Sequence, residues 1–226
     1  MNLRKISEEL PRSMATRDWV FQVIRTAIVR GELPGGMPLR QDEISSALNV
    51  SHIPVREAFR QLEAQGLVRI YPNRGAAVTQ LSRKELGDLM DTRILLEVGA
   101  LRSAMTHLTD KDIAAANALL EEFSREQDSV RGAEINLKLH FALYSPCNNQ
   151  VLLSMIDQVH ANVDRYITPF YHEEHNDQMY SYGEHSQIIA ACKEGDTELA
   201  TALLRTHLQR TKEVLQSSPM LAAEKA

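Results

Sequence analysis

Three histidines in the C-terminal two-thirds of the chain have the residue type and the placement of metal ligands. His140, His185 and His207 each lie on the apolar stripe of an expected helix, where a polar ring needs a polar partner. One such histidine alone is best explained as a hydrogen-bonded core residue. Three that converge in one bundle favour a metal site, because bundles build such sites from side chains on facing helices. Asn136 lies one turn before His140 on the same face, so its side-chain oxygen can join the three rings.

Such a site has open coordination positions. Neutral imidazoles bind Zn²⁺ or Ni²⁺, which we expect first, or Mn²⁺ or Co²⁺, and three of them leave room for water or an exogenous anion. One alternative to an anion-binding metal site is a protein whose metal is purely structural, or absent, and which binds an apolar effector. A metal-dependent hydrolase, in which zinc activates water, is a more remote one. The sequence has no acidic residue at the H-E-x-x-H spacing, no nucleophile elbow and no phosphate loop, so we expect no enzyme activity.

A second set of side chains, in SHIPVREAFRQLEAQG at residues 51–66, forms a basic row. His52, Arg56 and Arg60 recur at i, i+4 and i+8 and therefore share one face of a helix. Like charges at this spacing cost an isolated helix roughly a few tenths of a kcal/mol per pair. The row is favourable against DNA, where phosphate contacts dominate affinity. Arg56 and Arg60 can bind phosphates or guanine, while Ser51 and His52 stand at the entrance of the helix.

The elements around this row follow the plan of a winged helix-turn-helix. Apolar spacing and capping residues predict three helices, over residues 16–31, Gln41–Leu48 and residues 51–66. Two short apolar runs, LVRIY and GAAVT, are joined by PNR and predict a β-hairpin. In this plan the second helix of the pair enters the major groove of DNA. The wing would reach the minor groove or the backbone through Arg69, Asn73 and Arg74.

From residue 81 onward the sequence predicts helices only. The capping box SRKE opens a helix that we expect to end near Thr106. Further helices are expected from Thr109 to a break near Gly132, over Glu134–Ser145, after Asn149 with a bend or interruption at Pro169, and over residues 179–193 and 196–216. An antiparallel bundle of six or seven helices is the natural architecture. The expected fold is therefore mainly α, with a winged helix-turn-helix over residues 1–78 and an all-helical domain over residues 79–226.

Composition is that of an ordinary soluble globular protein. Hydrophobic residues make up 43% of the 226 residues and charged residues 24%. The first residues lack a secretory apolar region, no apolar run approaches the roughly 18–20 residues of a membrane span, and two distant cysteines argue against a disulfide framework. We therefore expect a cytoplasmic protein with no membrane contact. Residues 1–80 carry 11 basic and 8 acidic side chains against 14 and 22 in the remainder, which weakly suggests that the first part meets a polyanion.

The stretch SHIPVREAFRQLEAQGLVRIYPNRGAAV resembles the most characteristic segment of the GntR family of bacterial transcription regulators. The family pattern runs SRTPVREAL, then L, then EGL, then a wing that ends in NRGA-V. The resemblance implies double-stranded DNA as a partner and the following DNA-binding residues: Arg40, Ser51, His52, Arg56, Arg60, Arg69, Asn73, Arg74 and Gly75.

Two positions depart from the family pattern. His52 and Asp42 stand where family members usually or often have Arg, and both positions tend to face DNA. The departures predict an atypical target sequence or affinity. Arg40 is expected to compensate in part for Asp42.

The rest of the chain resembles the all-helical FCD effector domain of the FadR-type branch of that family. The resemblance is carried by RILLE at 93–97, NLKLHFALYSPCNNQVL at 136–152 and EHSQIIAACKEGDTELATALLRTHL at 184–208. In that domain one Asp and three His hold a divalent metal at the base of a ligand cavity. The histidines carry over onto His140, His185 and His207. The Asp position is Asn136, which is neutral, binds metal less strongly and leaves the site more positive.

These features predict a ligand-responsive transcription regulator, most simply a repressor. A homodimer would place two recognition helices on a palindromic operator. The resemblance implies that a small organic acid enters the helical domain, with its carboxylate on the metal and near Arg93, and with Arg165 as a second contact. We expect the connection over residues 75–82 to transmit the effect of the ligand to the DNA-binding part. The ligand can change the arrangement of the two domains only if it binds one arrangement more tightly than another.

Overall fold

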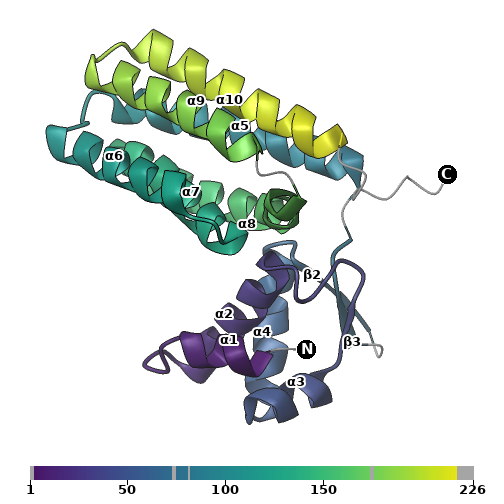
Figure 1. The fold of residues 1–226 in the computed structure, drawn as a ribbon. Coiled ribbons are helices and arrows are strands. Elements are labelled where there is room, and N and C mark those ends of the chain that lie inside the picture. The colour runs from purple at the N-terminus through teal and green to yellow at the C-terminus, as the bar shows by residue number, and fades with distance from the viewer. Residues whose placement is uncertain (1–2, 73–74, 81, 174–175, 218–226) are drawn as a thin grey trace. The chain divides into compact units, whose positions relative to one another are not determined.

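The computed structural model describes the backbone of residues 3–72, 75–80, 82–173 and 176–217, and the side chains of these residues apart from positions 129, 166, 168–173 and 176–180. The chain forms two compact units, Met1–Leu81 and Ser82–Ala226, each with a hydrophobic core of its own (Figure 1). We refer to them as the N-terminal unit and the helical unit.

The N-terminal unit is a winged helix-turn-helix, as the sequence predicts. Its elements in chain order are α1 (Leu3–Glu9), α2 (Thr16–Val29), β1 (Pro38–Leu39), α3 (Gln41–Leu48), α4 (His52–Ala64), β2 (Val68–Tyr71) and β3 (Gly75–Val78). The strands form an antiparallel sheet in the order β1–β3–β2, in which Val68 pairs with Val78. The sequence predicts neither α1 nor β1. A strand of two residues is too short to show a period, and β1 exists because Leu39 pairs with Ala76 on β3.

Local signals in the sequence fix the position of α4. Asn49 ends α3 in the left-handed region, with φ of 54°, and Ser51 precedes α4 as its N-cap residue. Val55 and Phe59, one turn apart, are buried in the core of the unit, where α4 packs against α2. Gly66, with φ of 75°, turns the chain out of the helix. The side of α4 opposite the core therefore faces outward.

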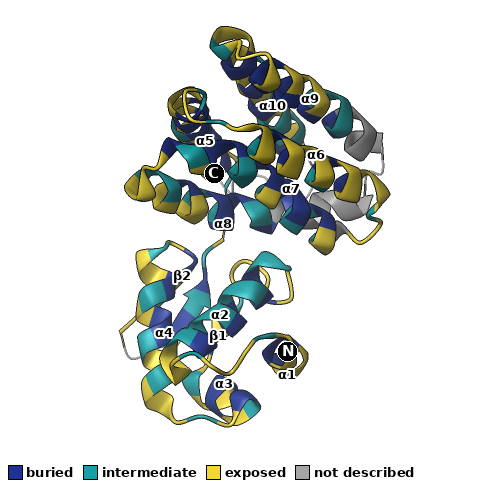
Figure 2. Ribbon diagram, turned by 90° about the vertical axis from the view of Figure 1, so that its left-hand side faces the viewer, coloured by how far each residue is buried: buried dark blue, intermediate teal, exposed yellow. Residues whose placement is uncertain are grey.

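The helical unit is a bundle of six α-helices with one short 3-10 helix among its described residues. They are α5 (Arg83–Ala104), α6 (Asp110–Arg125), α7 (Ser129–Tyr144), η1 (Ser145–Cys147), α8 (Gln150–Glu173), α9 (Asn176–Lys193) and α10 (Thr197–Ser217). Helix α10 packs against α5 and α9, α6 against α7 and α9, and α8 against α5 and α7. Buried residues lie on the sides of these helices that face one another (Figure 2).

Two expected boundaries are wrong. The break expected near Gly132 lies at residues 126–128, because the Asp128 side chain accepts a hydrogen bond from the backbone N–H of Arg131 and starts α7 there. Helix α8 continues past Pro169, so an interruption there, one of the two expected alternatives, is wrong, while a bend stays a prediction. Proline inside a helix costs roughly 3 kcal/mol. The burial of Val163 and Ile167 on the same helix, within a cluster shared with α5 and α10, offsets that cost.

Candidate metal centre and nucleic-acid interface

The three predicted histidines come together inside the helical unit. His140 on α7, His185 on α9 and His207 on α10 are all buried, and we call them the histidine trio. Their ring centroids lie 5.0, 5.4 and 4.5 Å apart. One nitrogen of each ring lies within 4.8 Å of one nitrogen of each of the others, and the Nε2 atoms of His140 and His185 are 2.9 Å apart. Three nitrogens at this spacing can bind one cation.

The surroundings of two members of the trio, His140 and His185, keep their rings in the form that binds metal. Burial lowers the pKa of His140 to about 4. Burial, together with the neighbouring His207 and His140, lowers the pKa of His185 well below its ordinary value. Both imidazoles are therefore neutral at neutral pH, and the neutral ring is the metal-binding form.

Asn136 is a candidate fourth ligand, because it lies on the same helix as His140. It lies on α7, one turn before His140, and is 7% exposed. Its Oδ1 atom is buried and accepts no hydrogen bond from any residue that the structure describes. An unsatisfied buried polar atom costs roughly 1–3 kcal/mol, so this oxygen is open to a partner that the described residues do not supply. A cation is such a partner, and the donor set of one amide oxygen and three imidazoles fits a divalent metal.

Glu97 on α5 is the centre of a buried hydrogen-bond network beside the trio. Its carboxylate accepts hydrogen bonds from Arg93 Nε, from the Tyr144 hydroxyl and, at 2.7 Å, from His160 Nε2. The Nδ1 atom of His140 lies 3.2 Å from Glu97 Oε2. Burial alone raises the pKa of Glu97, but the charges of Arg93 and His160 and the hydrogen bonds hold it well below its usual range. The interior of the bundle thus holds an ionised carboxylate.

The two arginines expected to contact a ligand are both buried. Arg93 is 2% exposed, and no described residue accepts a hydrogen bond from its Nη groups, since its bond to Glu97 uses Nε. Arg165 on α8 is 9% exposed, and its Nε donates to the backbone carbonyl of Asn162 at 3.3 Å. Neither arginine is a surface residue.

Sequence reasoning missed three members of this site. His160 lies on the buried side of α8 with Ile156 and Val163, a spacing of four and three residues that was a usable signal. Glu97 pairs with Arg93 one turn before it on α5, a spacing visible in RILLE, but its histidine and tyrosine partners come from other helices, as do the partners of Glu184. Glu184 accepts a hydrogen bond from His207 Nδ1 at 2.7 Å, a pairing set by the packing of α9 on α10.

In the N-terminal unit, Arg56 and Arg60 are exposed on the outer side of α4 and form what we call the arginine row. Neither guanidinium has a hydrogen bond or an ion pair with any part of the chain that the structure describes. Ser51, at the start of the helix, is exposed as well. The arginine row is therefore available to a polyanion.

The two positions that depart from the family pattern contact each other. His52 Nδ1 at the start of α4 lies 3.4 Å from Asp42 Oδ1 on α3, and both side chains are exposed. Arg40 does not pair with Asp42 among the described contacts, and its Nη1 lies 3.6 Å from Glu43 Oε1. That Arg40 compensates toward DNA for the missing arginine at position 42 stays a prediction.

The wing is described in part. Arg69 is exposed, and its guanidinium lies 5.9 Å from the ring centroid of Tyr71. Gly75 has a φ of 85°, and a Cβ atom there would lie 3.2 Å from the backbone oxygen of Leu39, so glycine is needed to bring β3 alongside β1. The expected DNA contacts Asn73 and Arg74 lie outside the described residues.

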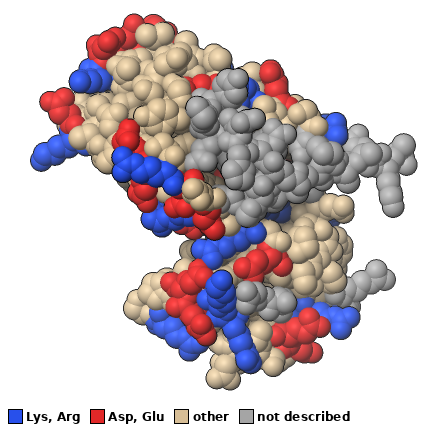
Figure 3. Space-filling view, viewed as in Figure 1, with Lys and Arg blue, Asp and Glu red and all other residues tan. Residues whose placement is uncertain are grey.

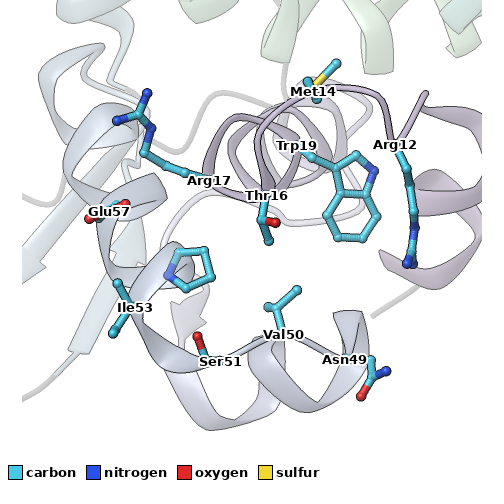
Figure 4. Close-up of a pocket in the computed structure, with 11 residues that line it drawn as sticks. Arg12, Met14, Thr16, Arg17, Trp19, Asn49, Val50, Ser51, Ile53 and Glu57 are labelled. Carbon is cyan, nitrogen blue, oxygen red and sulfur yellow. The ribbon is translucent and has the colours of Figure 1, made fainter.

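A hollow of about 530 Å³ opens beside the first turn of α4 (Figure 4). Its lining comes from the start of α2, from the turn between α3 and α4, and from α4 itself. The Arg12 guanidinium stacks over the Trp19 ring, 4.6 Å from its centroid. Ile53 at the edge is 60% exposed, and an exposed apolar side chain on this turn suits contact with the methyl group of thymine.

The described side chains on one face of the N-terminal unit do not form a patch of a single charge (Figure 3). On the face of the N-terminal unit drawn in Figure 3, basic and acidic side chains are interspersed. The case for DNA therefore depends on the placement of particular arginines.

Among the described residues, none of the helices is long and apolar enough to cross a membrane.

Comparisons with known proteins agree with both halves of this description. Residues 16–78 match the family described as bacterial regulatory proteins, gntR family, and residues 88–210 match the FCD domain. The HTH-type transcriptional repressor RspR of Escherichia coli is 25% identical over 222 residues, which cover 92% of each chain. A probable D-xylose utilization operon transcriptional repressor of Paenarthrobacter nicotinovorans is 29% identical over 85% of this chain and 87% of its own.

Solved structures show the same fold. Escherichia coli McbR/YncC superposes with a TM-score of 0.80 at 22% identity, over 89% of this chain and 97% of the other. Because the matched families and the relatives are transcription regulators, the expectation that the chain is not an enzyme is confirmed, and the hydrolase interpretation is set aside. The chain belongs to the GntR family of bacterial transcription regulators and carries the FCD domain of its FadR-type branch.

Proposed function

We propose that this protein is a ligand-responsive repressor that binds a palindromic operator as a homodimer and senses a small carboxylate at a metal centre in its helical unit. The observation that carries the sensing part is the convergence of the histidine trio, with the unsatisfied oxygen of Asn136 one turn away on α7. Two relatives are named as repressors, and one of these is named for an operon that uses a sugar, which supports the assignment of a repressor.

The DNA-binding part rests on the outer side of α4. The arginine row is exposed and has no partner among the described residues, which is what a surface kept for phosphates and guanine requires. Ser51, His52 and Ile53 then stand at base edges. Family members usually or often have arginine at positions 42 and 52, and both arginines would attract DNA. Here the two positions hold a carboxylate and a histidine that contact each other. This difference favours an operator unlike that of most relatives. The other proposed contacts are Arg40, Arg69, Asn73, Arg74 and Gly75.

The metal would be held by Asn136 and the trio, with Zn²⁺ or Ni²⁺ as the preferred ions. When bound, it supplies a Lewis-acid cation for an anionic group. All four protein ligands are neutral, so the full charge of the ion remains to attract a carboxylate. The Nη groups of Arg93, and Arg165 as a second contact, would bind the rest of the acid. A thermal-shift screen over sugar acids, hydroxy acids and dicarboxylates would identify it, since binding raises stability by mass action.

Asn136→Asp is expected to tighten metal binding. The substitution keeps the shape of the side chain and adds a negative ligand to three neutral ones, so the affinity for Zn²⁺ should rise at least about tenfold, as for one charged contact of roughly 1.5 kcal/mol. Competition with a chromophoric chelator measures the change. An unchanged affinity would show that position 136 is not a ligand.

DNase footprinting on the protein's own promoter tests the proposal as a whole. The wild-type protein should protect two half-sites related by a two-fold axis, about one helical turn apart or a multiple of it. Failure to protect any promoter segment above the level seen on unrelated DNA would contradict the operator assignment. Protection of one isolated half-site would contradict the homodimer.

A further inference from the structure

Each ring of the histidine trio is held by its Nδ1 atom, on the side away from the site. His140 Nδ1 contacts the Tyr144 hydroxyl at 2.8 Å and Glu97 Oε2 at 3.2 Å. His207 Nδ1 lies 2.7 Å from Glu184 Oε2, and His185 Nδ1 lies 3.3 Å from Ser181 Oγ. The partner of each Nδ1 decides which nitrogen of that ring carries the proton.

For His140 the proton position follows by elimination. Tyr144 has one hydroxyl proton, and it donates that proton to Glu97. The hydroxyl therefore cannot donate to His140, and the carboxylate of Glu97 can only accept. Nδ1 of His140 must be the donor in both of its contacts. Its Nε2 consequently has a free lone pair, aimed at the other rings.

His207 reaches the same state through a different carboxylate. Arg210 holds Glu184 from the far side, with Nε on one oxygen at 2.7 Å and Nη2 on the other at 3.1 Å. The carboxylate of Glu184 is bound by this guanidinium and can only accept, so a neutral His207 ring carries its proton on Nδ1 and leaves Nε2 bare. Arg93–Glu97–His140 and Arg210–Glu184–His207 are two chains of the same composition.

His185 differs from its two neighbours. Its Nε2 lies 2.9 Å from the bare Nε2 of His140, so a hydrogen bond there requires the proton to sit on His185. Its Nδ1 then accepts from Ser181 Oγ. A hydroxyl can donate or accept, and so Ser181 permits His185 to carry its proton on either nitrogen.

We propose that Glu97 and Glu184 are positioning residues that keep His140 and His207 in the metal-binding tautomer in advance. His185 engages last, by giving up its proton at Nε2 and taking one at Nδ1, where Ser181 turns from donor to acceptor. His185 stays neutral throughout, so the change is balanced in protons. The inference rests on the proposed metal centre, but its first part concerns the metal-free protein and is tested there.

Nitrogen-15 NMR of the histidine side chains tests the tautomers directly. In metal-free protein at about pH 8, where imidazoles with the usual pKa are neutral, His140 and His207 should be protonated on Nδ1 and His185 on Nε2. One equivalent of Zn²⁺ should move the His185 proton to Nδ1. A proton on Nε2 of either His140 or His207 in metal-free protein would overturn the proposal.

Variants of Glu184 test the consequence for affinity. Glu184 is part-exposed, unlike Glu97, so its replacement is compatible with folding, which circular dichroism verifies. Glu184→Ala should weaken Zn²⁺ binding by about 10–100-fold. Glu184→Gln should lose less, because its amide oxygen still accepts from Nδ1. Glu213→Ala, on the exposed side of α10, is the matched control and should bind as the wild type does.

The two kinds of failure are distinguishable. If the wild type does not bind Zn²⁺, the proposed metal centre is wrong, while the tautomers of the metal-free protein still decide whether Glu97 and Glu184 position the rings. If the wild type binds Zn²⁺ and Glu184→Ala binds it equally tightly, the metal centre stands and the positioning role is overturned.

Discussion

His185→Ala protein, purified without a nickel column, is expected to contain almost none of the metal found in the wild type. The substitution removes one of three converging imidazoles and leaves His140 and His207 with the amide of Asn136. Loss of a partner that only orients a ligand costs about 10–100-fold in metal affinity. Loss of the ligand itself should cost more. Elemental analysis of the two proteins, side by side, measures the difference.

His107→Ala is the matched control for this experiment. His107 is an exposed histidine just after α5, hydrogen-bonded to the neighbouring turn and absent from the trio. Its removal should leave the metal content unchanged. Equal metal content in the wild type and in His185→Ala would exclude His185 as a ligand and favour a regulator without a functional metal.

Glu97→Ala is expected to lower the free energy of unfolding of the helical unit by about 3–5 kcal/mol. Removing one partner of a buried ion pair leaves the other charge buried and uncompensated, and this lowers the free energy of unfolding by about 3–5 kcal/mol. Glu97 is 0% exposed and its partner Arg93 2%. Tyr144 and His160 would lose their acceptor in the same step. The side chain therefore contributes far more than a surface carboxylate.

Urea unfolding followed by far-ultraviolet circular dichroism measures this loss, because the helical unit holds most of the helix. Trp19, the only tryptophan, lies in the core of the N-terminal unit, so its fluorescence reports on the other half of the chain and should keep its midpoint. Glu198→Ala breaks the exposed pair with Arg102 and should cost only about 0.2–1 kcal/mol. A loss of that size for Glu97→Ala would refute the buried-pair account.

The N-terminal unit was largely predictable because its signals are local. Ser51 as a cap, Val55 and Phe59 at helical spacing and Gly66 as a terminator define α4 within a few residues of sequence. By contrast, β1 forms only because β3 lies beside it, and its two residues carry no pattern of their own. Elements that exist through a partner distant in the chain leave little trace in their own sequence.

At the candidate metal centre, the convergence of the three histidines was predictable, but the residues that contact them were not. The trio stood out because polar rings on apolar stripes are conspicuous. Glu97 and Glu184 did not, because charged residues are usually exposed, and nothing in the sequence shows that Glu97 is buried or that Glu184 is half-buried against Arg210 of α10. His160 followed a readable spacing and was passed over for lack of a visible partner, since that partner, Glu97, lies 63 positions away in sequence.

The structure relates the two positions that depart from the family pattern, Asp42 and His52, to each other. Asp42 and His52 read as two separate losses of positive charge in the sequence. They lie 3.4 Å apart on α3 and α4, so they form one paired change at the entrance of the recognition helix. Because neighbouring substitutions couple, the effect on operator preference of replacing both by arginine is expected to differ from the sum of the two single replacements.

The most direct test of the central claim, that the arginine row of α4 contacts DNA, is the affinity of wild-type and Arg56→Ala proteins for the footprinted promoter segment, measured by fluorescence anisotropy at one salt concentration. We predict that Arg56→Ala binds between about fivefold and about 150-fold more weakly, as the loss of an arginine contact of roughly 1–3 kcal/mol implies. Arg205→Ala, an exposed arginine on α10, should bind like the wild type. Equal affinities for the wild type and Arg56→Ala would contradict the claim.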